Sequence, residues 1–283
     1  RGESERIWSL VDAAYDPIDW HVDFKSGYRW SEGIWYKDIR NYRTRGADPK
    51  VPWELARFQH LPQLALAYKN SRREDIVREY RNQIIDFVAN NPPRYGINWA
   101  STMEVGIRAA NWILAYSIFH SEGVDYDKEF RAILERSLFE HGRHIIMNLE
   151  WYGRRRGNHY LANIAGLAFI GSALRRNRSC RKWLGFAIGQ LGREVQYQFT
   201  PDGCHFEKST AYHRYASDIV LFATALIHGL PARLRCRVID APPGIPELIG
   251  LWPAEVVKHT YGNASCPNSG SSRRVASPFP PEY

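Results

Sequence analysis

The sequence has few of the residues that build disulfide frameworks and metal sites. Only four of its 283 residues are cysteines, Cys180, Cys204, Cys236 and Cys266, and no two of them form a C-x-x-C pair. Neither a zinc site nor a disulfide scaffold is therefore expected. Long apolar runs are missing as well, since none approaches the roughly 18 residues that a bilayer-spanning helix needs. Membrane insertion is accordingly not expected, and no cofactor is indicated.

Acidic residues are outnumbered by basic ones, which gives a formal net charge of +8 and a pI of about 9.3. Such an excess favours an acidic partner, namely nucleic acid, anionic lipid or an acidic polysaccharide. Zinc-finger spacing, an RNA-binding aromatic motif and a long basic helix are all missing, so nucleic acid is not expected. The chain opens with Arg1, without an apolar signal segment, which leaves its cellular location open.

Hydrophobic residues make up 44% of the chain, and their spacing predicts successive helices with short connections. We expect an all-α array of antiparallel helices, because no convincing strand alternation precedes residue 230. The run Ser101–Glu104 resembles a capping box, and the predicted fifth long helix is apolar enough to be buried on most sides. The expected helices are a short one within 5–15, one opening near Trp53, and 73–90, 101–120, 128–148, 158–174, 181–198 and 207–228.

The chain divides into three parts by composition. Residues 1–50 are predicted to be an irregular lead-in, and residues 51–230 carry the helical pattern. Nine of the 16 prolines fall in residues 231–283, which also contain a serine-rich stretch. We expect this tail to be poorly ordered.

Two helix openings combine an amide, an imidazole and a phenol. Glu207, Tyr212 and His213 lie within seven positions, and Asn158 with His159 precedes them by about fifty residues. These groups suit the removal of a proton next to a carboxylate. The alternatives are structural: an Asn at a helix start often only caps the helix, and a Tyr-His pair is often a core or surface pair.

Four stretches strengthen the chemical interpretation when they are taken together, in this order and spacing. They are Pro52–Leu61, Asn98–Trp99 with Met103–Trp112, Gly157–Asn163 and Asp202–Tyr215. Over residues 50–228 the chain thereby resembles the helical N-terminal domain of the heparinase II/III-like polysaccharide lyases, a group related to alginate lyases. The resemblance implies an incomplete (α/α) toroid. Members of the group usually continue into an antiparallel β-sandwich, which we do not expect after Leu230.

The resemblance also implies a reaction, the β-elimination of an acidic polysaccharide at a uronic acid. Asn158 is expected to neutralise the uronate carboxylate, and His159 to act as a base or as a second neutralising group. Tyr212 is the expected acid on the leaving oxygen, and in some members such a tyrosine is also the base. His213 is expected to orient Tyr212 or to touch the substrate, and Arg214 to supply positive charge.

Further residues are candidates for substrate binding. Arg108 is the candidate to pair with an acidic group of the substrate, whereas an internal Glu104–Arg108 pair at i, i+4 is the structural alternative. Glu207 has a capping or supporting role as its alternative. The substrate-binding candidates are Glu104, Arg108, Asn111, Trp99, Glu207 and Arg214, with Trp53 and His60 as further cleft candidates.

We therefore predict a lyase acting on a heparin-like, heparan-sulfate-like or alginate-like polysaccharide, periplasmic or secreted by resemblance. A non-catalytic acidic-glycan-binding remnant of such an enzyme is the main alternative. A glycoside hydrolase would need two carboxylic acids across the cleft, whereas Glu207 is a lone carboxylate here. A metal role for His159, His205 and His213 lacks ligand spacing. The sequence does not indicate an oligomeric state.

Overall fold

The computed structural model describes residues 2–39, 46–151 and 156–231. The chain forms two compact units, residues 1–144 and 145–283. Within the described ranges the structure is mostly helical, which confirms the predicted all-α class. The toroid and the division at residues 50 and 230 stay predictions. Residues 232–283 of the predicted tail lie outside the described residues.

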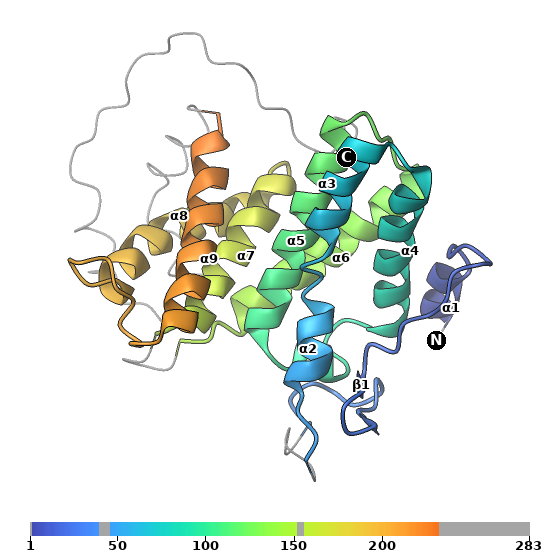
Figure 1. Ribbon diagram of the computed structural model, residues 1–283, viewed down its shortest axis with the longest axis horizontal. Coiled ribbons are helices and arrows are strands. Elements are labelled where there is room, and N and C mark those ends of the chain that lie inside the picture. Colours follow the sequence, from blue (N-terminus) through green and yellow to red (C-terminus); the bar gives the residue numbers. More distant parts are fainter. Residues whose placement is uncertain (1, 40–45, 152–155, 232–283) are drawn as a thin grey trace. The chain divides into compact units, whose positions relative to one another are not determined.

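Unit 1 is built from helices that pack through aromatic side chains. Helix α3 (Leu61–Ser71) packs beside both α4 (Glu74–Asn90) and α5 (Thr102–Ser121) (Figure 1). The Tyr80 hydroxyl donates to the Trp112 carbonyl at 2.9 Å, and Phe58, Phe87 and Trp112 meet edge to face around this contact. The elements are α1 (Gly2–Trp8), α2 (Lys50–Ala56), α3 (Leu61–Ser71), α4 (Glu74–Asn90), the 3₁₀ turn η1 (Ile97–Trp99), α5 (Thr102–Ser121) and α6 (Lys128–Met147), which ends in unit 2.

Two local predictions in unit 1 are wrong. The helix expected from Trp53 onward is two helices, α2 and α3, because Phe58 between them takes a left-handed backbone with φ of 55°. Ser101 is the N-cap of α5, but its side chain makes no capping bond. The capping box does not form because the Glu104 carboxylate is bound by Arg57 instead.

A small hairpin precedes the helices of unit 1. Strands β1 (Val22–Asp23) and β2 (Tyr28–Arg29) pair antiparallel. The Asp23 carboxylate organises the turn, since it accepts from the backbone of Lys25, the hydroxyl of Ser26 and the backbone of Asp48. These bonds hold the pKa of Asp23 down at about 2. Strands of two residues have no alternation to detect, so the sequence did not reveal them.

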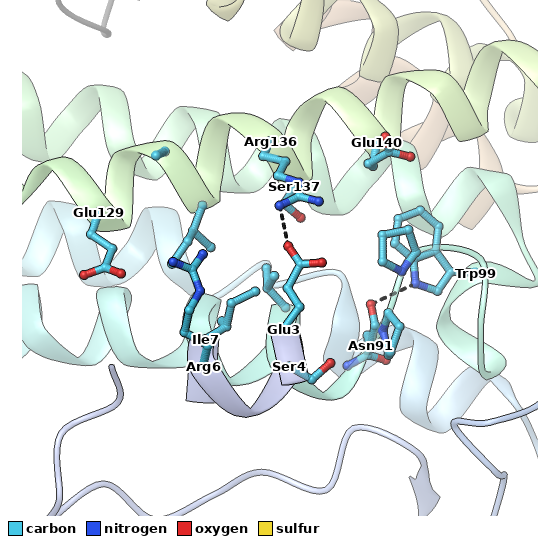
Figure 2. A pocket seen from close by; sticks show the side chains of 15 residues that line it. Glu3, Ser4, Arg6, Ile7, Asn91, Trp99, Glu129, Arg136, Ser137 and Glu140 are labelled. Atoms are coloured by element: carbon cyan, nitrogen blue, oxygen red, sulfur yellow. Dashed lines mark hydrogen bonds and ion pairs between the residues drawn. The ribbon is translucent and has the colours of Figure 1, made fainter. Parts of the chain in front are cut away.

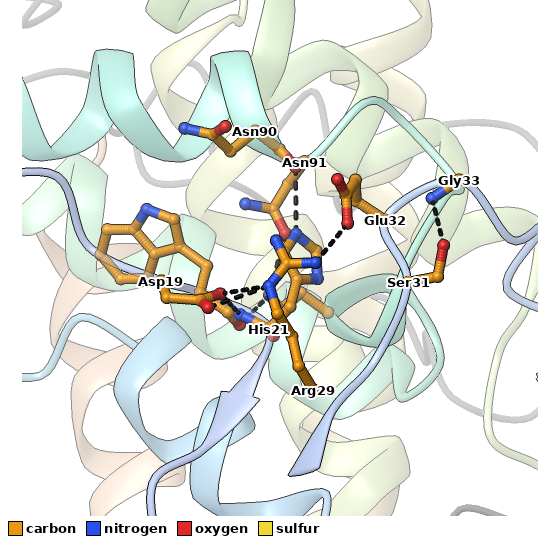
Figure 3. Close-up of polar contacts among 10 residues, drawn as sticks. Asp19, His21, Arg29, Ser31, Glu32, Gly33, Asn90 and Asn91 are labelled. Atoms are coloured by element: carbon orange, nitrogen blue, oxygen red, sulfur yellow. Dashed lines mark hydrogen bonds and ion pairs between the residues drawn. The ribbon is translucent and has the colours of Figure 1, made fainter. Parts of the chain in front are cut away.

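Side chains around the hairpin fasten it to the end of α4 (Figure 3). The buried His21 ring places Nε2 3.1 Å from the carbonyl of Asn90. Arg29 forms ion pairs with Asp19 at 2.9 Å and with Glu32 at 2.8 Å. The lead-in that the sequence predicts as irregular is thus held in place by specific polar contacts.

Unit 2 contains α7 (Asn158–Ala173), α8 (Arg178–Gln198) and α9 (Thr210–Gly229), and α7 contacts both others. Every residue of α7 except His159 is buried, which confirms the prediction for this apolar helix. A Cβ at Gly171 would lie 2.7 Å from the carbonyl oxygen of Cys180 at the start of α8. At the other end Gln198 donates to the Gly157 carbonyl. The two helices are therefore antiparallel and close.

Candidate active site

The starts of α7 and α9 carry the residues with predicted catalytic roles. Gly157 is the N-cap of α7, and Asn158 is the first helical residue. Ser209 caps α9 by accepting from the backbone of Tyr212. The segment between α8 and α9 makes an isolated bridge between Phe199 and His205. This bridge turns the chain back toward the start of α7.

Glu207 of this segment binds Asn158 directly. The Asn158 amide nitrogen Nδ2 lies 2.8 Å from Oε1 and 3.1 Å from Oε2, and the backbone N–H of Asn158 also donates to Oε1 at 3.2 Å. Gly157 leaves room for this approach, because a Cβ there would lie 2.9 Å from Oε1. Asn158 is nearly buried, so the carboxylate fixes the orientation of its amide.

His205 connects Glu207 to the start of α9. Its Nδ1 accepts from the backbone N–H of Glu207 at 3.4 Å, so the ring proton lies on Nε2, which donates to Gln198 Oε1 at 3.1 Å. The backbone N–H of His205 donates to Nδ1 of His213 at 3.3 Å. Burial lowers the pKa of His205. A neutral imidazole thus links the Glu207 segment to His213.

A buried chain of polar groups supports His205 from α8. The Gln198 amide donates to Glu194 Oε2 at 2.9 Å and to the Gly157 carbonyl at 3.2 Å. Glu194 is fully buried and pairs with Arg156 at 3.1 Å, and burial raises its pKa. The Arg156 guanidinium lies 4.2 Å from the ring centre of Tyr197. These contacts hold the buried side chains of Glu194 and Gln198 in one arrangement.

His159 is the one exposed residue of α7, and its ring is held by a carboxylate. Nδ1 lies 3.0 Å from Glu150 Oε1. Glu150 Oε2 accepts from the side-chain amide of Asn163 at 3.1 Å, and the backbone N–H of Glu150 donates to Asn163 Oδ1 at 2.8 Å. An imidazole beside Asn158 therefore has a fixed carboxylate partner.

Tyr212, His213 and Arg214 are all exposed in the first turn of α9. Within the described residues, neither the Tyr212 hydroxyl nor the Arg214 guanidinium forms a hydrogen bond. The structure thus brings Asn158, Glu207 and His213 into one hydrogen-bonded arrangement. Their roles on a substrate stay predictions.

Arg108 is a core residue of unit 1. It is 0% exposed, its Nε donates to Nε2 of His141 at 2.9 Å, and its Nη2 donates to the carbonyl of Asn98 at 3.3 Å. The guanidinium lies 4.5 Å from the ring centre of Phe87. Burial lowers the pKa of Arg108 to about 9. The structure thus favours a structural role for Arg108 over substrate binding. The partner of Arg108 is His141, whereas the expected internal partner was Glu104.

The other candidates in unit 1 also make internal contacts. Glu104 is 1% exposed and binds Arg57 through both oxygens, at 2.5 and 2.9 Å. Asn111 donates to the Arg57 carbonyl at 2.8 Å. Trp99 is buried, with its Nε1 donating to the Asn91 carbonyl at 3.3 Å. Two further cleft candidates are partly buried: Trp53 donates to the Ile97 carbonyl, and His60 contacts Gln83.

A pocket of about 340 Å³ opens in unit 1 beside α1 and α6 (Figure 2). Trp99 lines it together with the ion pair of Glu3 and Arg136. Of the predicted site residues, this pocket includes Trp99 alone. It is therefore not the cleft in which the predicted chemistry would take place.

Several functional candidates were missed by sequence reasoning. Asn163 could have been found from the sequence, because it is a polar residue inside an otherwise apolar helix. The others are set by tertiary contacts: Glu150, Glu194 and Gln198 have no distinguishing local pattern. Among the described residues, no group of three or more His, Cys, Asp and Glu is arranged to hold a metal ion. Nor does any helix in those ranges combine the length and apolarity required to cross a bilayer.

Comparison with known proteins gives related results from sequence and from structure. A heparin-sulfate lyase of Pedobacter heparinus is 26% identical over 194 residues, which cover 66% of this chain and 28% of that protein. A heparin-sulfate lyase of Bacteroides thetaiotaomicron is 25% identical over 175 residues, covering 61% and 24%. The chain thus spans about a quarter to a third of the length of the curated relatives it matches.

A solved heparinase III gene product superimposes with a TM-score of 0.53 at 20% identity, over 88% of this chain and 38% of the other. At this identity the likeness concerns the fold, and it agrees with the mostly helical structure. The family profile described as Heparinase II/III N-terminus matches residues 8–230, most of the chain. The chain therefore belongs to the heparinase II/III N-terminus family.

Proposed function

We propose that the chain carries the helical part of the active site of a polysaccharide lyase, which cleaves a uronate-containing acidic polysaccharide by β-elimination. The main support is the fixed amide of Asn158, which Glu207 holds beside His159 at the start of α7. Tyr212 and His213 lie at the start of α9, which His205 links to the same segment. The relatives named heparin-sulfate lyases favour a heparan-sulfate-like chain over alginate.

The chemical difficulty is the weak acidity of the C5–H bond of a uronate. Removing this proton places negative charge on a carboxylate that is already ionised. A neutral donor oriented at that carboxylate stabilises the developing dianion, and a preorganised donor does so without reorganisation in the transition state. An amide suits this task because it remains uncharged and donates hydrogen bonds at every working pH.

The contacts of Asn158 support this role. Its Nδ2 carries two hydrogens. Both oxygens that it contacts belong to the single carboxylate of Glu207 and therefore lie on the same side of the nitrogen. The second hydrogen points in a different direction and is the one that would meet a uronate. In this proposal Glu207 orients the amide and takes no proton from the substrate.

Tyr212 is the proposed acid for the leaving glycosidic oxygen. Its phenol is exposed in the first turn of α9, directly before two further polar side chains that face solvent. Its neighbours His213 and Arg214 supply hydrogen-bond donors, and Arg214 supplies a positive charge that stabilises the tyrosinate formed after proton donation. Arg214 would also attract the acidic chain.

Ultraviolet absorbance of the unsaturated uronate tests the reaction. The protein is mixed with heparan sulfate, heparin, alginate and hyaluronan in separate reactions, and absorbance is followed together with the release of reducing ends. We expect both to rise together for heparan sulfate, and Tyr212→Phe to lower turnover by at least about 100-fold. Reducing ends without the absorbance would identify hydrolysis and overturn the proposal.

A non-catalytic acidic-glycan-binding protein is the second candidate. It is favoured by the net charge of +8, which would attract an acidic polysaccharide whether or not the chain is cleaved. Salt-dependent binding of heparan sulfate with no unsaturated product would support this candidate. The same reactions therefore decide between the two functions.

A further inference from the structure

The side chains of Glu150, His159 and Asn163 form a unit at the start of α7, and Glu150 and Asn163 have no role in the proposed function. The carboxylate of Glu150 lies between the imidazole of His159 and the side-chain amide of Asn163. The His159 side chain is 52% exposed, whereas that of Glu150 is 11% exposed and Asn163 is fully buried. The unit thus runs from the interior of α7 to a solvent-facing imidazole beside Asn158.

We infer that Glu150 is a positioning residue that keeps the proton of His159 on Nδ1 and thereby makes Nε2 the base of the elimination reaction. This inference rests on the proposed lyase function. An ionised carboxylate only accepts hydrogen bonds. The 3.0 Å contact between Oε1 and Nδ1 therefore requires the proton on Nδ1, which leaves the lone pair of the neutral ring on Nε2.

Asn163 prevents Glu150 from turning away. The Asn163 side chain donates through Nδ2 to Oε2 of Glu150, and its Oδ1 accepts from the backbone N–H of Glu150. Both polar atoms of the Asn163 amide thus form hydrogen bonds with Glu150. The amide orientation is thereby fixed, with its nitrogen toward the carboxylate. Because Asn163 is fully buried on α7, the carboxylate is tied to the same helix that carries His159.

The exposed imidazole of His213 at the start of α9 has the opposite arrangement. Nδ1 of His213 accepts from the backbone N–H of His205, so a neutral His213 carries its proton on Nε2. His213 therefore offers an N–H donor, whereas His159 offers an acceptor. Of the two rings at the helix starts, the contacts assign the base to His159 and a donor role to His213.

The proposed step is balanced in protons and electrons. Nε2 of His159 takes the C5 proton, and the C5–H electron pair forms the C4–C5 double bond. The C4–O bond breaks, and its electron pair stays on the glycosidic oxygen, which takes the proton of the Tyr212 hydroxyl. Imidazolium and tyrosinate remain, and proton exchange with water restores both.

Glu150→Gln is a sharp test because Asn163 dictates how the new amide must face. The Asn163 nitrogen requires an acceptor, so the Gln oxygen turns toward Asn163 and the Gln nitrogen turns toward His159. His159 Nδ1 must then accept, and its proton moves to Nε2. Nitrogen-15 NMR of the labelled full chain, with the imidazole neutral, reports which ring nitrogen carries the proton.

We expect the proton on Nδ1 in the unchanged protein and on Nε2 in Glu150→Gln, with kcat on heparan sulfate reduced about 100-fold and KM little changed. Asp218→Asn, an exposed change in α9, is the matched control and should alter neither reading. A proton on Nε2 in the unchanged protein, or an unaltered tautomer in Glu150→Gln, would overturn the inference.

The outcomes separate this inference from the proposed function. If Tyr212→Phe abolishes turnover while Glu150→Gln inverts the tautomer and leaves kcat intact, the chain is a lyase and His159 is not its base. If no polysaccharide yields unsaturated uronate, the lyase function fails, and the NMR result still decides whether Glu150 sets the tautomer of His159.

Discussion

The side-chain amide of Asn158 donates to both carboxylate oxygens of Glu207, at 2.8 and 3.1 Å, although the residues are 49 positions apart. The contact joins the first residue of α7 to the segment before α9. A buried amide needs such an acceptor, and here the acceptor also determines where the remaining amide hydrogen points. The two helix openings are therefore parts of one polar arrangement and not separate caps.

Glu207→Gln tests this arrangement directly. The amide of Gln cannot accept through both of its terminal atoms, so one of them faces a donor of Asn158. We expect a loss of about 1–3 kcal/mol in the stability of unit 2 and at least about 100-fold lower turnover. Denaturant unfolding and the uronate absorbance measure the two effects. Asp218→Asn is the control, and equal turnover in the two variants would contradict the role of Glu207.

Gly157→Ala should move the same carboxylate without removing any polar group. A Cβ would lie 2.9 Å from Glu207 Oε1, so the flexible carboxylate must shift away from Asn158. We expect turnover to fall while the fold is retained, because only the end of one side chain has to move.

The matched control for this change is Gly192→Ala in α8, where no atom outside the local helix backbone lies within 4 Å of the added methyl group. It should stabilise the helix by up to about 1 kcal/mol and leave turnover unchanged. Circular dichroism during heating, together with the activity assay, compares the two variants. Identical behaviour of both would argue against a geometric role for Gly157.

The sequence predicted the helices well because their apolar periodicity is long and local. It predicted α7 as a buried helix, and the structure confirms this. It missed the break between α2 and α3 although Pro62 in the first turn of α3 was an available signal, because the apolar spacing continues through Phe58, whose left-handed backbone is rare for a buried aromatic residue. Local patterns thus suffice for long helices and fail where tertiary packing imposes a rare backbone conformation.

For the candidate site, the sequence identified the residue types but not their partners. Arg108 was expected to face the substrate or Glu104, and it instead contacts His141 in the core. An i, i+4 spacing only makes a pair possible, and here Arg57, at the end of α2, competes for Glu104. Such a choice depends on which helices lie adjacent, which the linear sequence does not specify.

Arg57→Met tests how much stability unit 1 loses when the Glu104 carboxylate has no countercharge. Glu104 is 1% exposed, so its carboxylate would lose its countercharge in a buried place. We expect unit 1 to be destabilised by about 3 kcal/mol. Arg73→Met is the control, because its ion pair with Asp75 is exposed and should contribute little. Denaturant unfolding curves of equal midpoint for both variants would refute the expected difference.

Lowering the pH should destabilise unit 1 before most carboxylates become protonated. Burial lowers the pKa of His21, His141 and His144, that of His144 from 6.5 to about 3. The unfolded chain therefore binds protons first as the pH falls, so this stability is complete above pH 6.5 and is lost below it. Between pH 6.5 and 5, the folded protein should lose about 2 kcal/mol of stability for each such histidine that stays neutral in it.

His144→Phe isolates one of these groups. Its ring packs against Tyr36 and Trp99, and the nearby cations Arg108, Arg94 and Lys37 also oppose its protonation. Phe keeps a ring at this position but cannot titrate, so the variant should lose less stability on acidification than the parent. Hydrogen exchange of α6 amides at several pH values measures this, with the exposed His120→Gln as control. An unchanged pH dependence in His144→Phe would mean that His144 is protonated in the folded protein, which its burial among three cations opposes.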